Sequence, residues 1–417
     1  MAVIEQERAT PRTTSTAMAV VQGLVAAAAV LFAVVISDHD FIDLDVYRAA
    51  AKSLLDGQGL YGSLPGSPYD LKYIYPPFAA VVLVPVTFLP LDVLHVAWTL
   101  GTVALVYFVL RAVMRRLGTS APELTALALL APALLLEPIR GTIGFGQVNM
   151  VIVALVVADC TGVIPKRFRG VGIGLAAAIK ITPLAFGLLL LVRRDFASIV
   201  RAGVAFVVAA GIGAVFAWED TKSFWTDVAY DTDRGGKPWY GPNQAITGPL
   251  ARLGLPDAVQ TGLWALAVLL VVAAAAYAAW QFTRTGEHVL AMCVVALAAL
   301  LAAPFAASHH WAYVILLLPL LVAPQYRSWR YLLALATVVF LLGAQWDLPG
   351  GGDRELHNWD LIQQFVGNGE CFVGIALLVG AVVVARERQR SWPTRRTELD
   401  VPERSGVQEG SEPVLPR

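Results

Sequence analysis

Residues 258–281 read AVQTGLWALAVLLVVAAAAYAAWQ and contain no charged side chain. A helix needs about 20 apolar residues to cross the roughly 30 Å hydrocarbon core of a bilayer, and this run is long enough. Inside lipid every backbone N–H and C=O must be paired within the segment, which a helix achieves. The stretch therefore predicts a transmembrane helix and, with it, the class of fold.

Apolar runs of the same kind recur on both sides of residues 258–281. The 417-residue chain has a mean hydropathy of +0.64, and 15% of its residues are charged, compared with about a quarter in a soluble domain. We predict an all-α polytopic membrane protein with about twelve transmembrane helices. The expected spans are 17–37, 77–90, 93–114, 122–137, 147–163, 170–192, 197–217, 258–281, 287–304, 311–324, 329–346 and 367–385.

The positions of Lys and Arg in short loops predict the orientation, because such loops are enriched in them on the cytoplasmic side. An even number of spans puts both termini on that side. The groups that then fall inside are Arg193–Arg194, Arg284, Arg327–Arg330 and the region of Arg386. Arg115–Arg116 and the group Lys166, Arg167 and Arg169 fall outside. Either a short segment, 77–90 or 122–137, does not cross, or these basic residues bind something outside.

This topology divides the chain into a cytoplasmic segment 1–16, a membrane domain 17–385 and a cytoplasmic tail 386–417. The tail is rich in Pro, Ser and Glu, a composition typical of disorder. The outer loops are 38–76, 218–257, 305–310 and 347–366. Polar residues gathered on one face favour an enzyme at the cell membrane with an extracytoplasmic active site. A transporter would more often place them at the midplane, in matching halves.

Charge and cysteine content exclude several classes of partner. Lys plus Arg and Asp plus Glu are balanced at 31 each, and no basic stripe indicates nucleic-acid binding. Cys160, Cys293 and Cys371 lie far apart in apolar runs and match no metal-binding spacing. We expect no cofactor and no metal site.

The first outer loop contains four aspartates within eight residues, Asp38, Asp40, Asp43 and Asp45. They could simply form a solvated cap on the preceding helix. The residues after Asp45 read as an amphipathic helix at the membrane interface. Such a helix would hold a carboxylate partly desolvated, where its pKa rises towards that of a general base.

Several polar residues lie next to or inside predicted spans, where they are costly unless paired. Glu137 and Arg140 could form an internal salt bridge or belong to a functional site. The other candidates of this kind for binding a substrate are Tyr47, Tyr75, Gln147 and Asn149.

Lys180 is the single charged residue of the run 170–192. It could meet a phosphate, or it could pair with Glu137. The glycines 170, 172 and 174 resemble a dinucleotide-binding loop, but no strand precedes them, and close packing of small residues explains them better.

Two further outer segments contain candidate residues. The loop 218–257 combines Trp218, Trp225, Trp239 and Tyr240 with Asn243 and Gln244, a mixture that suits sugar binding as well as an interfacial aromatic belt. The run His309-His310-Trp311 places two histidines next to each other, and Trp311 is a further candidate for binding the substrate. Metal-binding pairs on a helix are usually four residues apart, so a role towards an anionic leaving group or a carboxylate is favoured.

Six stretches, in this order, resemble the actinobacterial polyprenyl-phosphate-mannose-dependent α-mannosyltransferases of glycosyltransferase family 87. They are IDLDVYRAAAKSLLDGQGLYG (42–62), YIYPPFAAVV (73–82), LEPIRGTIGFGQVNMVIV (136–153), GIGLAAAIKITPLAF (172–186), NQAITGPLARL (243–253) and SHHWAYVILLLP (308–319). Within that family the chain looks most similar to the α-(1→2)-mannosyltransferases that branch lipomannan and lipoarabinomannan. Enzymes that elongate phosphatidylinositol mannosides are the nearest alternative.

The resemblance implies a GT-C membrane fold and an inverting transfer of mannose from polyprenyl phosphate mannose to a mannan acceptor. It implies that Asp43, the first aspartate of a D-x-x-V-Y pattern, is the general base, supported by Asp45. His309 and His310 correspond to the paired histidines of the family. Relatives usually read Ser-Pro-x-Ser-Trp before that pair, whereas this chain has Ala303-Pro304-Phe305-Ala306-Ala307, which leaves the acceptor open. An arabinosyltransferase of the same fold and a transporter of lipid-linked sugars are the alternatives.

Overall fold

The computed structural model describes residues 28, 31, 40–347 and 359–399. The predicted cytoplasmic segment 1–16, the first span 17–37, most of the loop 347–366 and the end of the tail after residue 399 lie outside the described residues.

The described residues form an all-helical protein. They contain no β-strand apart from an isolated bridge between Asn243 and Ala307, so the predicted all-α class is confirmed. The α-helices are α2 (Ile42–Leu55), α3 (Pro77–Leu83), α4 (Leu91–Arg116), α5 (Pro122–Leu135), α6 (Glu137–Gly144), α7 (Asn149–Thr161), α8 (Val171–Ile179), α9 (Gly187–Val192), α10 (Phe196–Phe216), α11 (Trp218–Thr226), α12 (Thr247–Arg252), α13 (Asp257–Arg284), α14 (His288–Ala302), α15 (Leu317–Val322), α16 (Arg330–Leu342), α17 (Leu361–Gly367) and α18 (Gly369–Leu399). The 3₁₀ segments that position the site are η2 (Val84–Phe88), η3 (Lys166–Phe168), η4 (Thr182–Phe186), η7 (Ser308–Leu316) and η8 (Pro324–Trp329).

Five helical runs in the described part are long and apolar enough to cross a membrane, and a sixth arises if the bent pair α5 and α6 is one span. They are Leu91–Arg116, Phe196–Phe216, Asp257–Arg284, Pro324–Trp346 and Gly369–Gln389. The protein is therefore a polytopic membrane protein, but the predicted count of about twelve spans is not confirmed. Shorter apolar helices account for much of the difference.

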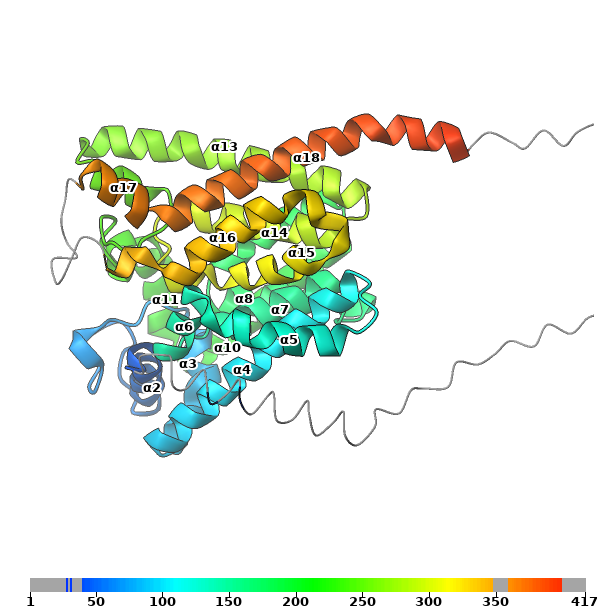
Figure 1. The fold of residues 1–417 in the computed structure, drawn as a ribbon. Coiled ribbons are helices and arrows are strands. Elements are labelled where there is room, and N and C mark those ends of the chain that lie inside the picture. The colour runs from blue at the N-terminus through cyan, green and yellow to red at the C-terminus, as the bar shows by residue number, and fades with distance from the viewer. Residues whose placement is uncertain (1–27, 29–30, 32–39, 348–358, 400–417) are drawn as a thin grey trace, which may run out of the picture.

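The loops rich in arginine meet at one end of the bundle, which we call the basic end. The charges of Arg116, Arg169 and Arg193 all act on His288 at the start of α14, and Glu287 beside it pairs with Arg388 of α18. In Figure 1, α2, α11 and α17 lie at the left of the bundle, whereas the end of α18 projects at the right.

The structure places Arg115–Arg116 and Lys166–Arg169 at the same end as Arg193–Arg194. This agrees with the alternative that a short segment does not cross, and it has two reasons. Segment 77–90 does not cross, because its end returns to α2, where Arg48 donates to the carbonyls of Thr87 and Leu89.

The second reason is that 170–192 is not one span but a hairpin of two short helical legs. Helix α8 leads away from the basic end, breaks at Lys180, which has extended backbone (φ −146°), and η4 with α9 leads back to Arg193. Helix α8 is about 14 Å long at 1.5 Å per residue, and η4 with α9 is about 19 Å long because a 3₁₀ segment rises about 2.0 Å per residue. Lys180 therefore lies at the tip of a hairpin.

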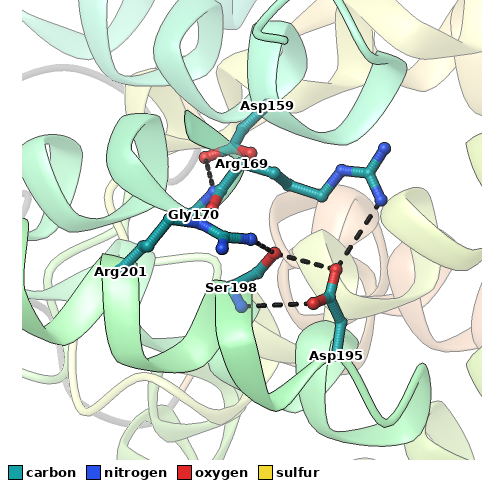
Figure 2. A network of polar contacts seen from close by, with 6 residues as sticks. All are labelled: Asp159, Arg169, Gly170, Asp195, Ser198 and Arg201. Carbon is teal, nitrogen blue, oxygen red and sulfur yellow. Dashed lines mark hydrogen bonds and ion pairs between the residues drawn. The ribbon is translucent and has the colours of Figure 1, made fainter. Parts of the chain in front are cut away.

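Polar contacts fix the base of this hairpin (Figure 2). Asp159 accepts the backbone N–H of Gly170, while Arg169 pairs with Asp195 at 3.6 Å, and Arg201 donates to Ser198 and to the Arg169 carbonyl. A Cβ on Gly170 would lie 2.1 Å from the Ser198 carbonyl oxygen. The glycines thus allow α8 to pack closely on α10, which confirms the packing interpretation of this stretch.

Candidate active site

A cavity of about 520 Å³ lies at the end of the bundle opposite the basic end, and we call it the site cavity. It brings together segments that are distant in the sequence, from α2, the α6–α7 turn, the tip of the α8 hairpin, the loop before α12 and the start of η7. Of the residues predicted for the site, it is lined by Asp43, Tyr75, Gln147, Lys180, His309 and His310.

The first turn of α2 is fixed by the turn that follows α6. The backbone N–H groups of Asp43 and Leu44 donate to the Phe145 carbonyl at 3.0 and 3.2 Å. Gly146 has φ +67°, and a Cβ there would lie 2.5 Å from the Cβ of Leu44. Glycine is therefore required at this close approach, which holds Asp43 at the cavity wall.

Asp43 is half-buried, and burial raises its pKa from 3.8 to about 6. A hydrogen bond from Gln147 and the positive charge of Lys180 act in the opposite direction and lower it. The result is a carboxylate whose pKa lies close to neutral pH, as a general base requires.

An aromatic and amide network supports the wall next to Asp43. The Tyr47 hydroxyl donates to Oε1 of Gln147 at 2.7 Å and lies 2.9 Å from the Tyr75 hydroxyl. Nε2 of Gln147 lies 3.5 Å from Nε2 of His309. Gln147 thus connects the tyrosines, Asp43 and the histidine pair.

Lys180 enters the cavity from the tip of its hairpin. Its Nζ lies 3.4 Å from Oδ1 of Asn149 and 5.5 Å from the ring centre of Tyr75. Asp43 supplies the negative charge that acts on it. The counter-ion is therefore Asp43 and not Glu137 as the sequence analysis allowed.

The histidine pair begins η7 and is fixed through its backbone. The His309 carbonyl accepts from Nδ2 of Asn149 at 2.8 Å and from the Thr142 hydroxyl at 3.2 Å. The rings of His309 and His310 are 4.6 Å apart and perpendicular. The described residues hold no group of three or more His, Cys, Asp or Glu side chains arranged for a metal ion.

Glu137 belongs to a buried carboxyl pair behind the histidines. Its partners are the Ser308 hydroxyl, the indole of Trp346 and, at 3.4 Å, the amide of Gln345. Ser308 also contacts Glu370 at 3.0 Å. Glu137 and Arg140 form no ion pair, since Arg140 reaches the Leu341 carbonyl instead, at 3.4 Å.

Four other predicted residues lie outside the cavity lining. Asp45 is partly exposed and lies 3.9 Å from His95. Trp311 is fully buried and packs on Phe340. Asn243 and Gln244 are fully buried and make backbone contacts: Asn243 accepts from Ala306 and Gln244 donates to the carbonyl of Gly367. These two amides hold the outer loops together.

The sequence analysis missed several cavity residues as individuals. Arg234 and Lys237 bring positive charge, while Trp346 adds to the aromatic wall formed by Trp239 and Tyr240. Arg234 is held by the carbonyls of Tyr73 and Tyr61. The signal that could have identified Arg234 and Lys237 is the cluster of Asp, Arg and Lys at 231–237, directly before Trp239 and Tyr240.

Known proteins resemble this chain over most of its length. The model of glycosyltransferase family 87 matches residues 73–304. A curated Mycolicibacterium smegmatis protein is 38% identical over 69% of this chain and 70% of its own length. Its name is polyprenol-phosphate-mannose-dependent alpha-(1-2)-phosphatidylinositol mannoside mannosyltransferase. A Mycobacterium tuberculosis protein of the same name is 35% identical over 83% of this chain and 86% of its own length.

A third curated relative, from Mycolicibacterium smegmatis, is named as a phosphatidylinositol pentamannoside mannosyltransferase and is 32% identical over 66% of this chain and 68% of its own length. Among solved structures, ArnT from Cupriavidus metallidurans bound to undecaprenyl phosphate matches 95% of this chain and 83% of that chain. The TM-score is 0.39 and the identity 19%, too low to support an argument. The extent of the family match and the identity to the curated relatives make this chain a glycosyltransferase that belongs to family 87.

Proposed function

We propose that the chain transfers mannose from polyprenyl phosphate mannose to a mannoside acceptor and forms an α-(1→2) linkage. The observation that carries the proposal is the juxtaposition of a half-buried Asp43, with a pKa of about 6, and Lys180 in one aromatic-walled cavity. The names of the relatives supply the donor and the linkage as the hypothesis to test.

Asp43 acts as the general base in this reaction. It accepts the proton of an acceptor hydroxyl while that oxygen bonds to the anomeric carbon of the mannosyl donor. The bond between the anomeric carbon and the phosphate oxygen breaks on the opposite face, and polyprenyl phosphate leaves with both bonding electrons. A single displacement inverts a β-linked donor into an α-linked product.

The leaving phosphate needs positive charge more than it needs a proton, and fixed charge in a site that excludes water is often the largest catalytic contribution. Lys180 is the best placed cation, and Arg234 and Lys237 add to it. Arg140 is not part of the cavity lining, so its effect on the phosphate is at most long-range. The histidine pair, fixed by Asn149 and Thr142, orients the acceptor next to Asp43.

The acceptor is a phosphatidylinositol mannoside or the mannan of lipomannan and lipoarabinomannan. The walls formed by Tyr75, Trp239, Tyr240 and Trp346 suit sugar rings, whose C–H faces stack on aromatic side chains. The names of the relatives support a phosphatidylinositol mannoside. The lipomannan alternative rests on the stretches FWTDVAYDTDR (224–234) and NQAITGPLARL (243–253), which resemble the lipomannan-branching enzymes more than the enzymes that elongate phosphatidylinositol mannosides.

The orientation follows from the basic end. If its arginines face the cytoplasm, as the positive-inside tendency predicts, the site cavity opens on the extracytoplasmic side of the cell membrane.

The test is a transfer assay with purified protein in detergent, polyprenyl phosphate mannose and a panel of phosphatidylinositol mannosides and lipomannan. Consumption of the donor with formation of an α-(1→2) product supports the proposal. An enzyme works in detergent, whereas a transporter needs a sealed bilayer. Activity with an arabinosyl donor but not with the mannosyl donor would favour the arabinosyltransferase.

A further inference from the structure

A second pocket opens at the basic end and shares no lining residue with the site cavity. It has a volume of about 390 Å³ and lies between the end of α4, the turn from α13 to α14 and the start of η8. We call it the basic pocket. The side chains that define it are Arg116, Glu287, His288, Gln325 and Tyr326.

Positive charge dominates the surroundings of this pocket. Arg116 lines it, and Arg169 and Arg193 act electrostatically from behind on His288, a neutral imidazole whose pKa is lowered to about 4 by burial and by these arginines. The nearby acids are already paired: Glu287 binds Arg388 and accepts the Tyr326 hydroxyl, while Asp195 binds Arg169 (Figure 2). Among the described residues neither Arg116 nor Arg193 forms an ion pair, although Asp195 attracts Arg193, so positive charge is in excess around the pocket.

Arg193 is a second cation near the pocket, and part of its guanidinium is buried without a hydrogen-bond partner among the described residues. Its Nε and Nη2 atoms are buried and have no hydrogen-bond partner within the part of the chain that the structure describes. Arg116 is exposed and forms no ion pair with any described residue. The charges of Arg116 and Arg193 repel each other, so an anion bound to Arg116 in the pocket would offset that repulsion.

We propose that the basic pocket binds a phosphate group, either of an anionic lipid headgroup or as free phosphate. Guanidinium groups present a planar set of donors that matches phosphate oxygens, which makes Arg116 the residue in contact and Arg193 the charge behind it. Ordinary enrichment of basic residues on one membrane side explains exposed side chains such as Arg167. It does not explain a preformed polar pocket lined by Arg116.

The inference does not depend on the proposed transferase activity, because the pocket is separate from Asp43.

The experiment uses the full-length protein in nanodiscs made of phosphatidylcholine alone, of phosphatidylcholine with phosphatidylglycerol, and of phosphatidylcholine with inorganic phosphate added. Thermal unfolding and native mass spectrometry of retained lipid are measured for wild type and Arg116→Gln. Arg167→Gln is the matched control, because Arg167 lies at the same end, is exposed and does not line the pocket.

We expect phosphatidylglycerol or phosphate to raise the unfolding temperature of wild type and of Arg167→Gln. Arg116→Gln should bind the same probe about tenfold more weakly, as expected for the loss of one charge-assisted hydrogen bond. Stabilisation by phosphatidylglycerol alone identifies a lipid headgroup, and stabilisation by inorganic phosphate identifies free phosphate. Equal responses of wild type and Arg116→Gln, an equal loss in both variants, or no response of wild type would overturn the proposal.

Discussion

Replacement of Lys180 by Gln removes the cation at the tip of the α8 hairpin. In the described structure the one hydrogen bond of the Lys180 side chain is to Asn149, at 3.4 Å. The loss in folding stability should therefore be small, about 0.5–1.5 kcal/mol. A charge-assisted hydrogen bond to the donor phosphate is worth about 1.5–3 kcal/mol, so KM for polyprenyl phosphate mannose should rise roughly 10- to 150-fold. KM for the acceptor should not change.

The same variant should also change the pH dependence. The base works as a carboxylate, so activity of wild type should fall as the pH decreases through the Asp43 pKa of about 6. The charge of Lys180 lowers the Asp43 pKa, so the pKa should rise when that charge is removed. The acidic limb of the kcat profile should therefore move to higher pH.

Steady-state kinetics with each substrate varied in turn, across a pH series, measures both effects. Thermal unfolding of the same samples is the control for stability. A large drop in the unfolding temperature with unchanged donor KM and an unmoved acidic limb would refute this reasoning. Lys180 would then serve the fold and not the donor phosphate.

Two further substitutions test the support of the site. Gly146→Ala should reduce kcat and stability strongly, because its Cβ would clash with Leu44. Gly162→Ala, with a similar φ of +86° and open space around it, should show only the cost of backbone strain, of order 1 kcal/mol. Equal losses of kcat and of thermal stability in the two variants would argue against the clash. Glu370→Gln should be tolerated, because the amide keeps an oxygen that can accept from Gln345 and removes one of two carboxyl groups that share the single hydrogen of the Ser308 hydroxyl. Glu370→Ala should lose about 1–3 kcal/mol in thermal unfolding, and a Gln variant as unstable as the Ala variant would contradict this assignment.

Hydropathy predicts the long helices well and the short ones poorly. The run 258–281 lies within α13, since nothing in it interrupts a helix. The run 170–192 has the same average hydropathy signal but reverses at Lys180, where Thr182-Pro183 follows. Pro lacks the N–H needed to continue the helix, so the sequence contains a signal for the break, which average hydropathy does not detect.

Polar residues next to apolar spans in the sequence predict which side chains meet in the site cavity, but not which polar side chains hold the surrounding loops together. Asp43, Gln147, Lys180 and the histidine pair meet because polar groups beside apolar spans need partners, and partners gather in one cavity. Asn243 and Gln244 carry the same polar groups but use them on backbone atoms. Composition cannot distinguish an amide that binds a sugar from one that holds two loops together.

The carboxyl pair shows a second limit. Glu370 lies near the start of the predicted span 367–385 and was not singled out in the sequence, but it contacts Ser308 beside the histidines. Its partner Glu137 was expected to pair with a cation. Which of several acids meets which base depends on tertiary packing over more than 170 residues, and no local pattern encodes that.

The identity of the general base is the central claim, and the turnover of Asp43→Asn compared with Asp45→Asn tests it most directly. The two residues are neighbours on α2, but Asp43 lines the site cavity whereas Asp45 faces His95. With polyprenyl phosphate mannose and a mannoside acceptor, Asp43→Asn should reduce kcat by about 10²–10⁴, and Asp45→Asn should retain most of the activity. Near wild-type turnover of Asp43→Asn with an inactive Asp45→Asn would assign the base to Asp45, and full activity of both variants would place the site elsewhere.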